Sequence, residues 1–185
     1  CDVGPRDGLQ NDPKTLEPTV RAELVDKLAD AGIPRIEAAS FVSPAHVPQM
    51  GGAEEVVEAI ERRDGVVYAG LVLNDKGYDR ARETALDEVH FAFAATETFN
   101  RRNQNASVEE SLETAERIVA RAHEDGLRAT VTVGVAFGCP FEGKVDPGTP
   151  LGLAELLAAA RADEIVFADT VGVGAPAWVY IDPSG

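Results

Sequence analysis

The chain has 185 residues, 44% of them hydrophobic, which suits a single domain with a substantial core. It carries 17 basic against 32 acidic residues, a formal net charge of −15. This balance argues against nucleic acid or an anionic membrane as a partner, because both require a basic surface. We find no apolar run near the roughly 20 residues of a membrane span and no signal peptide. The two cysteines provide no disulfide framework, so we expect a cytoplasmic protein.

Short apolar segments alternate with amphipathic segments along the chain. After a strand stub near Val3, the predicted strands cover Arg35–Ser40, Val66–Leu73, Glu88–Ala94, Arg128–Val135 and Glu164–Ala168. The predicted helices cover Thr19–Ala31, Ala53–Arg63, Lys76–Thr84, Val108–Asp125 and Pro150–Arg161. The alternation indicates parallel βαβ units, in either a closed (β/α) barrel or an open doubly wound sheet.

The placement of polar residues separates these two architectures. They lie at or just after the predicted strand ends, at Arg6, Asp7, Glu37, Ser40, Asn74, Glu97, Asp169 and Thr170. All such ends open on one mouth in a barrel, whereas most would lie far from the crevice of an open sheet. We therefore predict an α/β fold of the TIM (β/α) barrel type. A complete barrel takes about 250 residues, so this single domain, residues 1–185, supplies about six of the eight βα units.

The most informative segment is Gly4–Gln10, with the sequence GPRDGLQ. Two glycines and a proline favour a fixed turn, since glycine permits unusual backbone angles and proline sets φ. We expect this turn to direct Arg6 and Asp7 outward at one target instead of letting them pair with each other. In an acidic protein, Arg6 is the first candidate to receive an anionic substrate.

The second predicted strand also ends in polar residues. A carboxylate at Glu37 and a hydroxyl at Ser40 would both lie near the mouth, although each could simply cap a turn or a helix. His46, in the loop that follows, is more typical of a surface residue. The polar segment after the strand Glu88–Ala94 is expected to be a loop, whose Arg101 and Arg102 could contact a phosphate or carboxylate, or could belong to a helix entry.

Two glycine-rich segments follow the later strands. Cys139 lies in the first of them, and without a neighbour that would activate its thiol we interpret it as structural. Asp169 and Thr170 precede two glycines in the second. That segment lacks the full dinucleotide-binding fingerprint, so we interpret it as a polar pair that faces the mouth.

Together these segments resemble the 3-hydroxy-3-methylglutaryl-CoA lyase family, one of the metal-dependent carbon–carbon lyase barrels. The matching segments, in order, are Gly4–Gln10, Ser40–Met50 (SFVSPAHVPQM), Glu97–Ser111 (ETFNRRNQNASVEES), Phe137–Gly143 (FGCPFEG) and Asp169–Gly174 (DTVGVG). The resemblance extends to about Pro176. It implies retro-aldol cleavage of an acyl-CoA substrate into acetyl-CoA and acetoacetate, as in leucine catabolism and ketone-body formation.

The resemblance also implies roles for individual residues. Asp7 would be a ligand of a divalent cation, Mg²⁺ or Mn²⁺, whose ordinary ligands are oxygen atoms. Arg6 would stabilise the enolate, and Glu37 and Asp169 would complete the catalytic group. Gln10, Ser40 and Thr170 would line the substrate site.

The chain also departs from the family pattern. The family's His-x-His metal ligands are absent, because His46, His90 and His123 lie far apart in the sequence. The pattern ends after Pro176, so we expect the 185-residue chain alone to be inactive, as part of a longer enzyme or as a relic. The alternatives are a related acyl-CoA condensing synthase or aldolase, and a non-catalytic partial barrel. An unclosed barrel edge also predicts a homo-oligomer.

Overall fold

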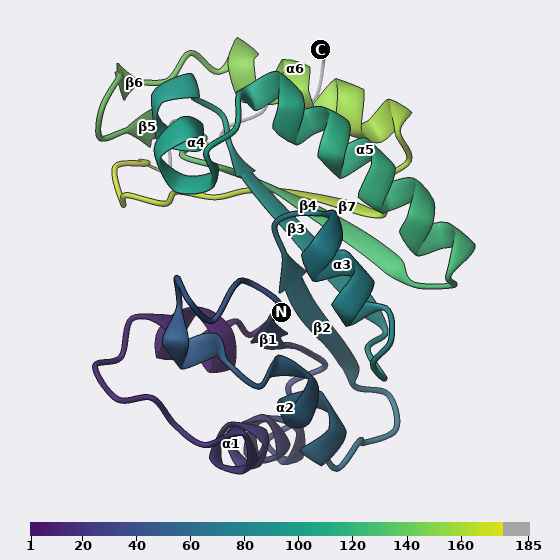
Figure 1. Ribbon diagram of the computed structural model, residues 1–185. Helices are drawn as coiled ribbons and strands as arrows, with labels where there is room; N and C mark the ends of the chain where they lie inside the picture. The colour runs from purple at the N-terminus through teal and green to yellow at the C-terminus, as the bar shows by residue number, and fades with distance from the viewer. Residues whose placement is uncertain (176–185) are drawn as a thin grey trace.

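The computed structural model describes residues 1–175, and its centre is a curved parallel sheet of five strands (Figure 1). The strands lie in the order β1 (Arg35–Ser40), β2 (Val67–Val72), β3 (Glu88–Ala94), β4 (Arg128–Gly134) and β7 (Glu164–Phe167). Each is adjacent to its predecessor in the sheet, as expected for consecutive βα units. Residues 176–185, where the motif pattern ends, lie outside the described residues.

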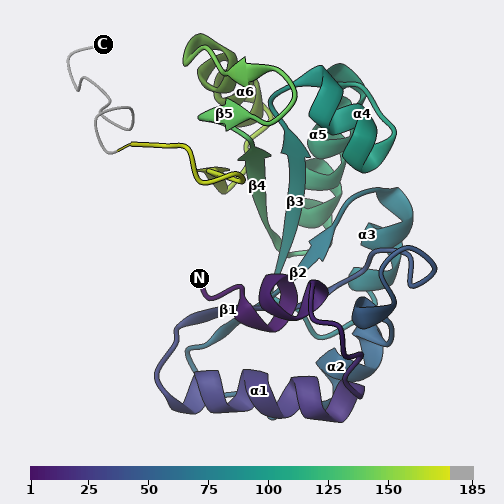
Figure 2. The ribbon, with the colours of Figure 1, turned by 90° about the vertical axis from the view of Figure 1, so that its left-hand side faces the viewer.

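The strand stub predicted near Val3 is present one residue earlier. Asp2 forms an isolated parallel bridge with Ile36. Its amide donates to the carbonyl of Arg35, and its carbonyl accepts from the amide of Glu37, both at 2.8 Å. The chain then enters a π-helical turn, η1 (Gly4–Gly8), which lies beside β1 (Figure 2). The stub and the five strands give the six strand positions that the sequence predicts, and within residues 1–175 the first five of them are each followed by a helix.

The helices of the βα units pack around the outside of the curved sheet (Figures 1 and 2). They are α1 (Pro18–Asp30), α2 (Ala53–Ala59), α3 (Asp75–Ala81), α5 (Val108–Glu124) and α6 (Gly148–Ala159). Shorter elements occupy the connections: η2 (Pro48–Met50), α4 (Glu97–Gln104) and a small hairpin of β5 (Gly138–Cys139) with β6 (Gly143–Lys144). No helix within residues 1–175 has the length and apolar character needed to cross a membrane.

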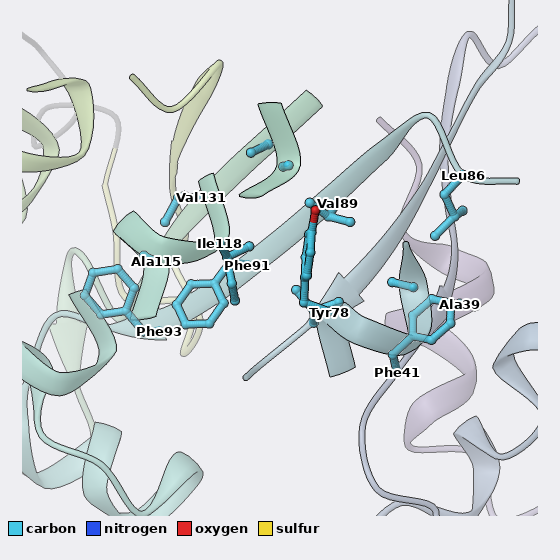
Figure 3. Packing of buried hydrophobic residues seen from close by; sticks show 14 of the residues in the cluster. Ala39, Phe41, Tyr78, Leu86, Val89, Phe91, Phe93, Ala115, Ile118 and Val131 are labelled. Carbon is cyan, nitrogen blue, oxygen red and sulfur yellow. The ribbon is translucent and has the colours of Figure 1, made fainter. Parts of the chain in front are cut away.

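The longest helix, α5, shows how local sequence and packing agree. Ser107 and Glu110 form a reciprocal capping box at its start. Its buried face presents Ala115 and Ile118 to Phe91 and other apolar residues of β3 and β4 (Figure 3). Burial of one such apolar side chain stabilises the fold by about 1.5–3 kcal/mol, so this face anchors the helix.

The two faces of the sheet have different chemistry. The outward face is apolar and meets the helices, through Val89, Phe91, Phe93, Val131 and Val133 among others. The alternate positions on β3 and β4 carry polar groups, at Glu88, His90 and Thr130. Since side chains alternate along a strand, these residues share the inward face, where they are buried against one another. The interior of this partial barrel is therefore polar and charged.

A β-bulge in β1 decides which residues join this interior. The register with β2 shifts between Glu37, which lies opposite Ala69, and Ala39, which lies opposite Gly70. Ser40 then lies opposite Leu71. Leu71 is two residues after Ala69 in β2, so the two residues lie on the same face of that strand. Three residues apart, Glu37 and Ser40 would face opposite sides of a regular strand. The extra residue places both toward the interior.

Most predicted element boundaries are within one or two residues of the observed ones, with three exceptions. The predicted helix Lys76–Thr84 ends three residues early, at Ala81. The predicted helix Ala53–Arg63 ends early, at Ala59, because Ile60 has an extended backbone with ψ of 128°. The segment 97–105 was expected to be a loop, but residues 97–104 form helix α4. The side chain of Asn100 is buried at its centre, where it accepts from the amide of Ala94 and donates to the carbonyl of Ser107.

Candidate active site

The turn η1 places Arg6 and Asp7 at the end of the stub strand. The amides of both residues donate to the carbonyl of Val3, at 3.1 and 2.7 Å. Arg6 is directed inward, with 16% of its side chain exposed, whereas 60% of the Asp7 side chain is exposed. Arg6 Nη1 nevertheless donates to Asp7 Oδ1 at 2.8 Å. The expectation that these two residues do not pair was wrong, because successive residues of this tight turn bring the two groups together.

Glu37 is the inner partner of Arg6. Arg6 Nε donates to Glu37 Oε1, and His90 Nδ1 contacts the other oxygen, Glu37 Oε2. Glu37 was predicted at a strand end, but it lies in the middle of β1 with its side chain in the interior. The correction matters because both oxygens of this carboxylate are engaged within the protein.

The contacts continue inward from His90. His90 Nε2 lies 3.4 Å from Glu88 Oε1, and the hydroxyl of Thr130 donates to the same oxygen. Arg35 Nη1 lies 3.5 Å from Glu88 Oε1 and donates to Glu164 Oε2 at 2.5 Å. We call the six charged residues the interior ion network: Arg6, Glu37, His90, Glu88, Arg35 and Glu164. It joins η1, β1, β3 and β7.

The charge states within this network follow from its contacts. Burial alone would raise the pKa of Glu37 and Glu88, but the contacts with His90 and the other partners outweigh it. The pKa of Glu37 is lowered, and that of Glu88 falls to about 2. Burial would lower the pKa of His90, but Glu37 and Glu88 raise it to about 9. These directions favour ionised carboxylates and a protonated imidazole at neutral pH.

Sequence reasoning missed His90 and Glu88 as members of this group. The available signal was two ionisable residues, two positions apart, in an otherwise apolar predicted strand. That spacing places both on one face. It does not reveal that the face is the interior, or that Glu37, 53 residues before His90, would contact it.

Two predicted substrate-binding residues have polar atoms without partners. Within the described part of the chain, the buried Gln10 Oε1 and Ser40 Oγ make no hydrogen bond. Ser40 is fully buried, at 0% exposure. Because an unpaired buried polar atom costs about 1–3 kcal/mol, these two atoms are suited to a ligand that supplies the missing partner.

Asp169 and Thr170 follow β7 after one intervening residue, Ala168, at the carboxyl end of the sheet, and both are exposed. Asp169 accepts the amides of Val173 and Gly174 at 3.0 and 2.8 Å. The hydroxyl of Thr170 accepts the amide of Val135 at 2.8 Å and so ties the loop after β4 to the loop after β7. Among residues 1–175, no recorded hydrogen bond or ion pair links Asp169 to Arg6, Asp7 or Glu37.

The remaining candidates lie outside this group. Cys139 is a buried free thiol that accepts a contact from the Thr96 hydroxyl at 3.1 Å. His46 is exposed, as expected for a surface residue. The arginine pair belongs to helix α4, where Arg101 pairs with Glu97 and Arg102 lies over the ring of Phe141.

The described residues do not by themselves complete a metal site. Within residues 1–175, no group of three or more His, Cys, Asp or Glu side chains is arranged to hold an ion. The exposed carboxylate of Asp7 is suited to supply one oxygen ligand. The residues present therefore fit a divalent cation in part, with one ligand.

Comparisons with known proteins agree with this architecture. The sequence model of the HMGL-like family matches residues 1–181. The chain is 42% identical over 173 residues to the 3-hydroxy-3-isohexenylglutaryl-CoA/hydroxymethylglutaryl-CoA lyase of Pseudomonas aeruginosa, covering 94% of this chain and 58% of that protein. It is 40% identical over 188 residues to (R)-citramalyl-CoA lyase of Chloroflexus aurantiacus, covering 96% of this chain and 59% of that protein.

The fold is shared with solved structures of the same kind. A hydroxymethylglutaryl-CoA lyase from Pseudomonas aeruginosa superposes with a TM-score of 0.90 at 41% identity, over 94% of this chain and 58% of that one. An HMG-CoA lyase from Acinetobacter baumannii, in complex with coenzyme A and 3-methylmalate, gives 0.92 at 34% identity, over 96% and 58%. The chain thus spans under two thirds of its relatives' length, as a partial TIM barrel. On its sequence, its sheet order and this structural likeness, the chain belongs to the HMGL-like family.

Proposed function

We propose that the protein carrying this chain is a carbon–carbon lyase that cleaves 3-hydroxy-3-methylglutaryl-CoA into acetyl-CoA and acetoacetate. Family membership supports the reaction type, and relatives with this activity are about 40% identical. The structural observation that carries the proposal is the fixed position of Arg6. Its guanidinium is held by Glu37 on one side and Asp7 on the other.

Arg6 has the geometry of an anion-stabilising group. Its partners within residues 1–175 use Nε and Nη1, which leaves Nη2 for a substrate oxygen. A fixed guanidinium stabilises the negative charge that develops on the thioester oxygen as the carbon–carbon bond breaks. Glu37 orients Arg6 in this proposal, since both of its oxygens are already engaged.

Further residues would bind and orient the substrate. The unpaired oxygens of Gln10 and Ser40 are available to polar substrate groups. We assign Asp169 and Thr170 to the same mouth, because parallel strands place β7 and β1 carboxyl ends on one side of the sheet.

The resident cofactor in this proposal is Mg²⁺ or Mn²⁺, with Asp7 as one ligand. When bound, such an ion acts as a Lewis acid that polarises the substrate hydroxyl and the adjacent oxygen. The described residues supply one carboxylate, so we expect residues 1–185 alone to show no turnover with saturating metal.

A second candidate is supported by the relative from Chloroflexus aurantiacus, named (R)-citramalyl-CoA lyase. That cleavage would release pyruvate in place of acetoacetate, because its substrate has one carbon fewer. A condensing synthase would instead form a carbon–carbon bond between acetyl-CoA and a 2-oxo acid, and an aldolase would form or cleave such a bond reversibly. A non-catalytic partial barrel would do neither.

The test compares these reactions in the complete gene product. We expect acetoacetate release from 3-hydroxy-3-methylglutaryl-CoA to exceed pyruvate release from citramalyl-CoA and condensation of acetyl-CoA with a 2-oxo acid. If pyruvate release were dominant, the protein would be a citramalyl-CoA lyase and the second candidate would hold. No turnover of any substrate, with metal saturating, would support the non-catalytic protein.

Two further properties complete the proposal. Cys1 and Cys139 are free thiols, which suits a reducing compartment such as the cytoplasm. We also propose a homo-oligomer of the complete gene product, in which the exposed apolar side chains of Leu151 and Leu156 on helix α6 would contact a second copy. Sedimentation of the complete gene product tests the second property, and a monomer at micromolar concentration would contradict it.

A further inference from the structure

The interior ion network alternates in charge from one contact to the next. In order of contact it runs from the cation Arg6 through Glu37, His90, Glu88 and Arg35 to Glu164. The alternation holds only while the central imidazole is positive. With a neutral ring at that position, two ionised carboxylates would face each other across it.

The contacts of the His90 ring favour the charged form. Nδ1 contacts Glu37 Oε2, and Nε2 lies 3.4 Å from Glu88 Oε1. A neutral imidazole carries one N–H and presents a lone pair at the other nitrogen. A neutral ring protonated only at Nε2 would therefore turn the Nδ1 lone pair toward Glu37 Oε2. A ring protonated only at Nδ1 would bring no positive charge to Glu88. The imidazolium donates to Glu37 and keeps a positive charge 3.4 Å from Glu88 Oε1, although within residues 1–175 Nε2 makes no hydrogen bond.

Each of the two carboxylates has one further cation within residues 1–175, Arg6 at Glu37 and Arg35 at Glu88, and His90 is the cation that contacts both. On the inward face, its register neighbours are Leu71 of β2 and Thr130 of β4. The charged groups that face it are Glu37 of β1 and Glu88 of its own strand. His90, Glu37 and Glu88 are 6%, 2% and 0% exposed, so solvent screens their interactions weakly.

We propose that His90 is a positioning residue: as a buried imidazolium it holds Glu37 in the ionised form that fixes the guanidinium of Arg6. This inference rests on the proposed function for the role of Arg6. It adds a residue to the site that touches no substrate and acts through Glu37. The raised pKa of His90 and the lowered pKa of Glu37 agree with it.

The first test measures charge without activity. The complete gene product is labelled with ¹⁵N-histidine, and the ring nitrogens of His90 are followed by NMR against pH, with His90→Gln for assignment. We expect both nitrogens to be protonated at neutral pH and to titrate near pH 9. A neutral ring at pH 7 overturns the proposal. The ¹³C carboxyl signal of Glu37 should titrate at higher pH in His90→Gln than in the parent, and an unchanged titration also overturns it.

The second test reads the effect on turnover. Supporting residues of this kind typically contribute about 10- to 100-fold to activity. We expect His90→Gln to lose that factor in kcat at acidic pH and to recover part of it as rising pH ionises Glu37. A loss that is equal at every pH indicates packing alone and contradicts the proposal. His90→Lys, which keeps a cation, should retain more activity than His90→Gln.

A double-mutant cycle tests whether His90 acts through Glu37. In a Glu37→Gln background, His90→Gln should change kcat by less than about 2-fold, since the carboxylate it supports is gone. Additive losses contradict the assignment. His123→Gln is the matched control, because His123 also pairs with a carboxylate, Asp163, but lies outside the network. It should leave kcat and its pH profile unchanged.

The two proposals fail separately. If the parent protein releases no acetoacetate, the proposed function fails, while the NMR measurements on His90 and Glu37 still decide this inference. If the parent is active and the ring is neutral, only the inference fails.

Discussion

The two edges of the sheet hold their site residues in different ways. At the β1 edge, Arg6 and Glu37 are fixed by charged side chains within the interior, and Glu37 is buried. At the β7 edge, Asp169 and Thr170 are exposed and bonded to backbone amides of nearby loops. All four residues of β7 are only partly buried, whereas most of β1 is fully buried.

The two edges therefore differ in how firmly they fix the direction of a side chain. Charged partners in a buried setting fix the direction of a side chain, because a buried charge that points away from its partners raises the free energy of the folded state. Backbone amides at an exposed loop fix a loop shape, but the carboxylate remains open to solvent. We therefore expect substitutions at the β1 edge to affect turnover strongly, and those at the β7 edge to affect it less.

The largest effect should follow Arg6→Lys. Lysine keeps the charge but lacks the planar fork that contacts Glu37 and Asp7 together. We expect kcat to fall by about 10²–10³ with a much smaller change in KM. Acetoacetate release by the complete gene product measures this. Arg62→Lys, at an exposed ion pair with Asp87, is the control. A rise in KM alone would show that Arg6 binds substrate without stabilising the transition state.

The network should also make stability depend on pH. The pKa of His90 is raised to about 9 in the folded chain, so its contribution is complete below about pH 6.5 and is lost as pH rises toward 9. The pKa of Glu88 is lowered to about 2, so its contribution is complete above about pH 4.5 and is lost at lower pH. The free energy of unfolding should be greatest between these limits.

The alkaline loss should reach up to about 3 kcal/mol, which is the His90 shift converted to free energy. Urea unfolding at a series of pH values measures it. His90→Gln should flatten the alkaline limb, while His123→Gln should not. An alkaline limb of the same size in both variants would assign the pH dependence to other groups.

Asp7→Asn should weaken metal binding before it changes turnover. An amide lacks the charge of a carboxylate, and we expect about a 10- to 100-fold increase in the Mn²⁺ concentration needed for half-maximal activity. Excess Mn²⁺ should restore part of the rate. Asp12→Asn, whose carboxylate caps a neighbouring loop at Lys14, is the control. If the Mn²⁺ requirement did not change, Asp7 would not be a metal ligand.

The smallest effect should come from the β7 edge. Asp169→Asn should lower kcat/KM by about 10-fold and the free energy of unfolding by about 1 kcal/mol, since one amide bond can remain. Asp163→Asn is matched to it, because Asp163 precedes the same strand and accepts the amide of Ala129. It should reduce stability without reducing turnover. If Asp163→Asn reduced turnover and Asp169→Asn did not, the mouth would lie at the amino end of β7.

Local pattern predicted most of the fold but only part of the site. The strands were found because apolar, β-branched segments are short and punctuated. Helix α4 was missed because its sequence is strongly polar, and what holds it is the buried Asn100 with its bonds to Ala94 and Ser107. The contact of His90 with Glu37 depends on the sheet register, which no single segment specifies. Motif residues such as Arg6 were therefore predicted, but their inner partners were not.

The bulge in β1 has a consequence for protein engineering. The segment from Glu37 to Ser40 would not transfer as a sequence motif alone, because an unbulged host strand would turn one of the two side chains toward the helices. A graft of this half-site has to import the backbone irregularity and the neighbouring strand that tolerates it. For the same reason, deleting a single residue between Glu37 and Ser40 should change the orientation of one functional group while leaving the composition of the strand almost unchanged.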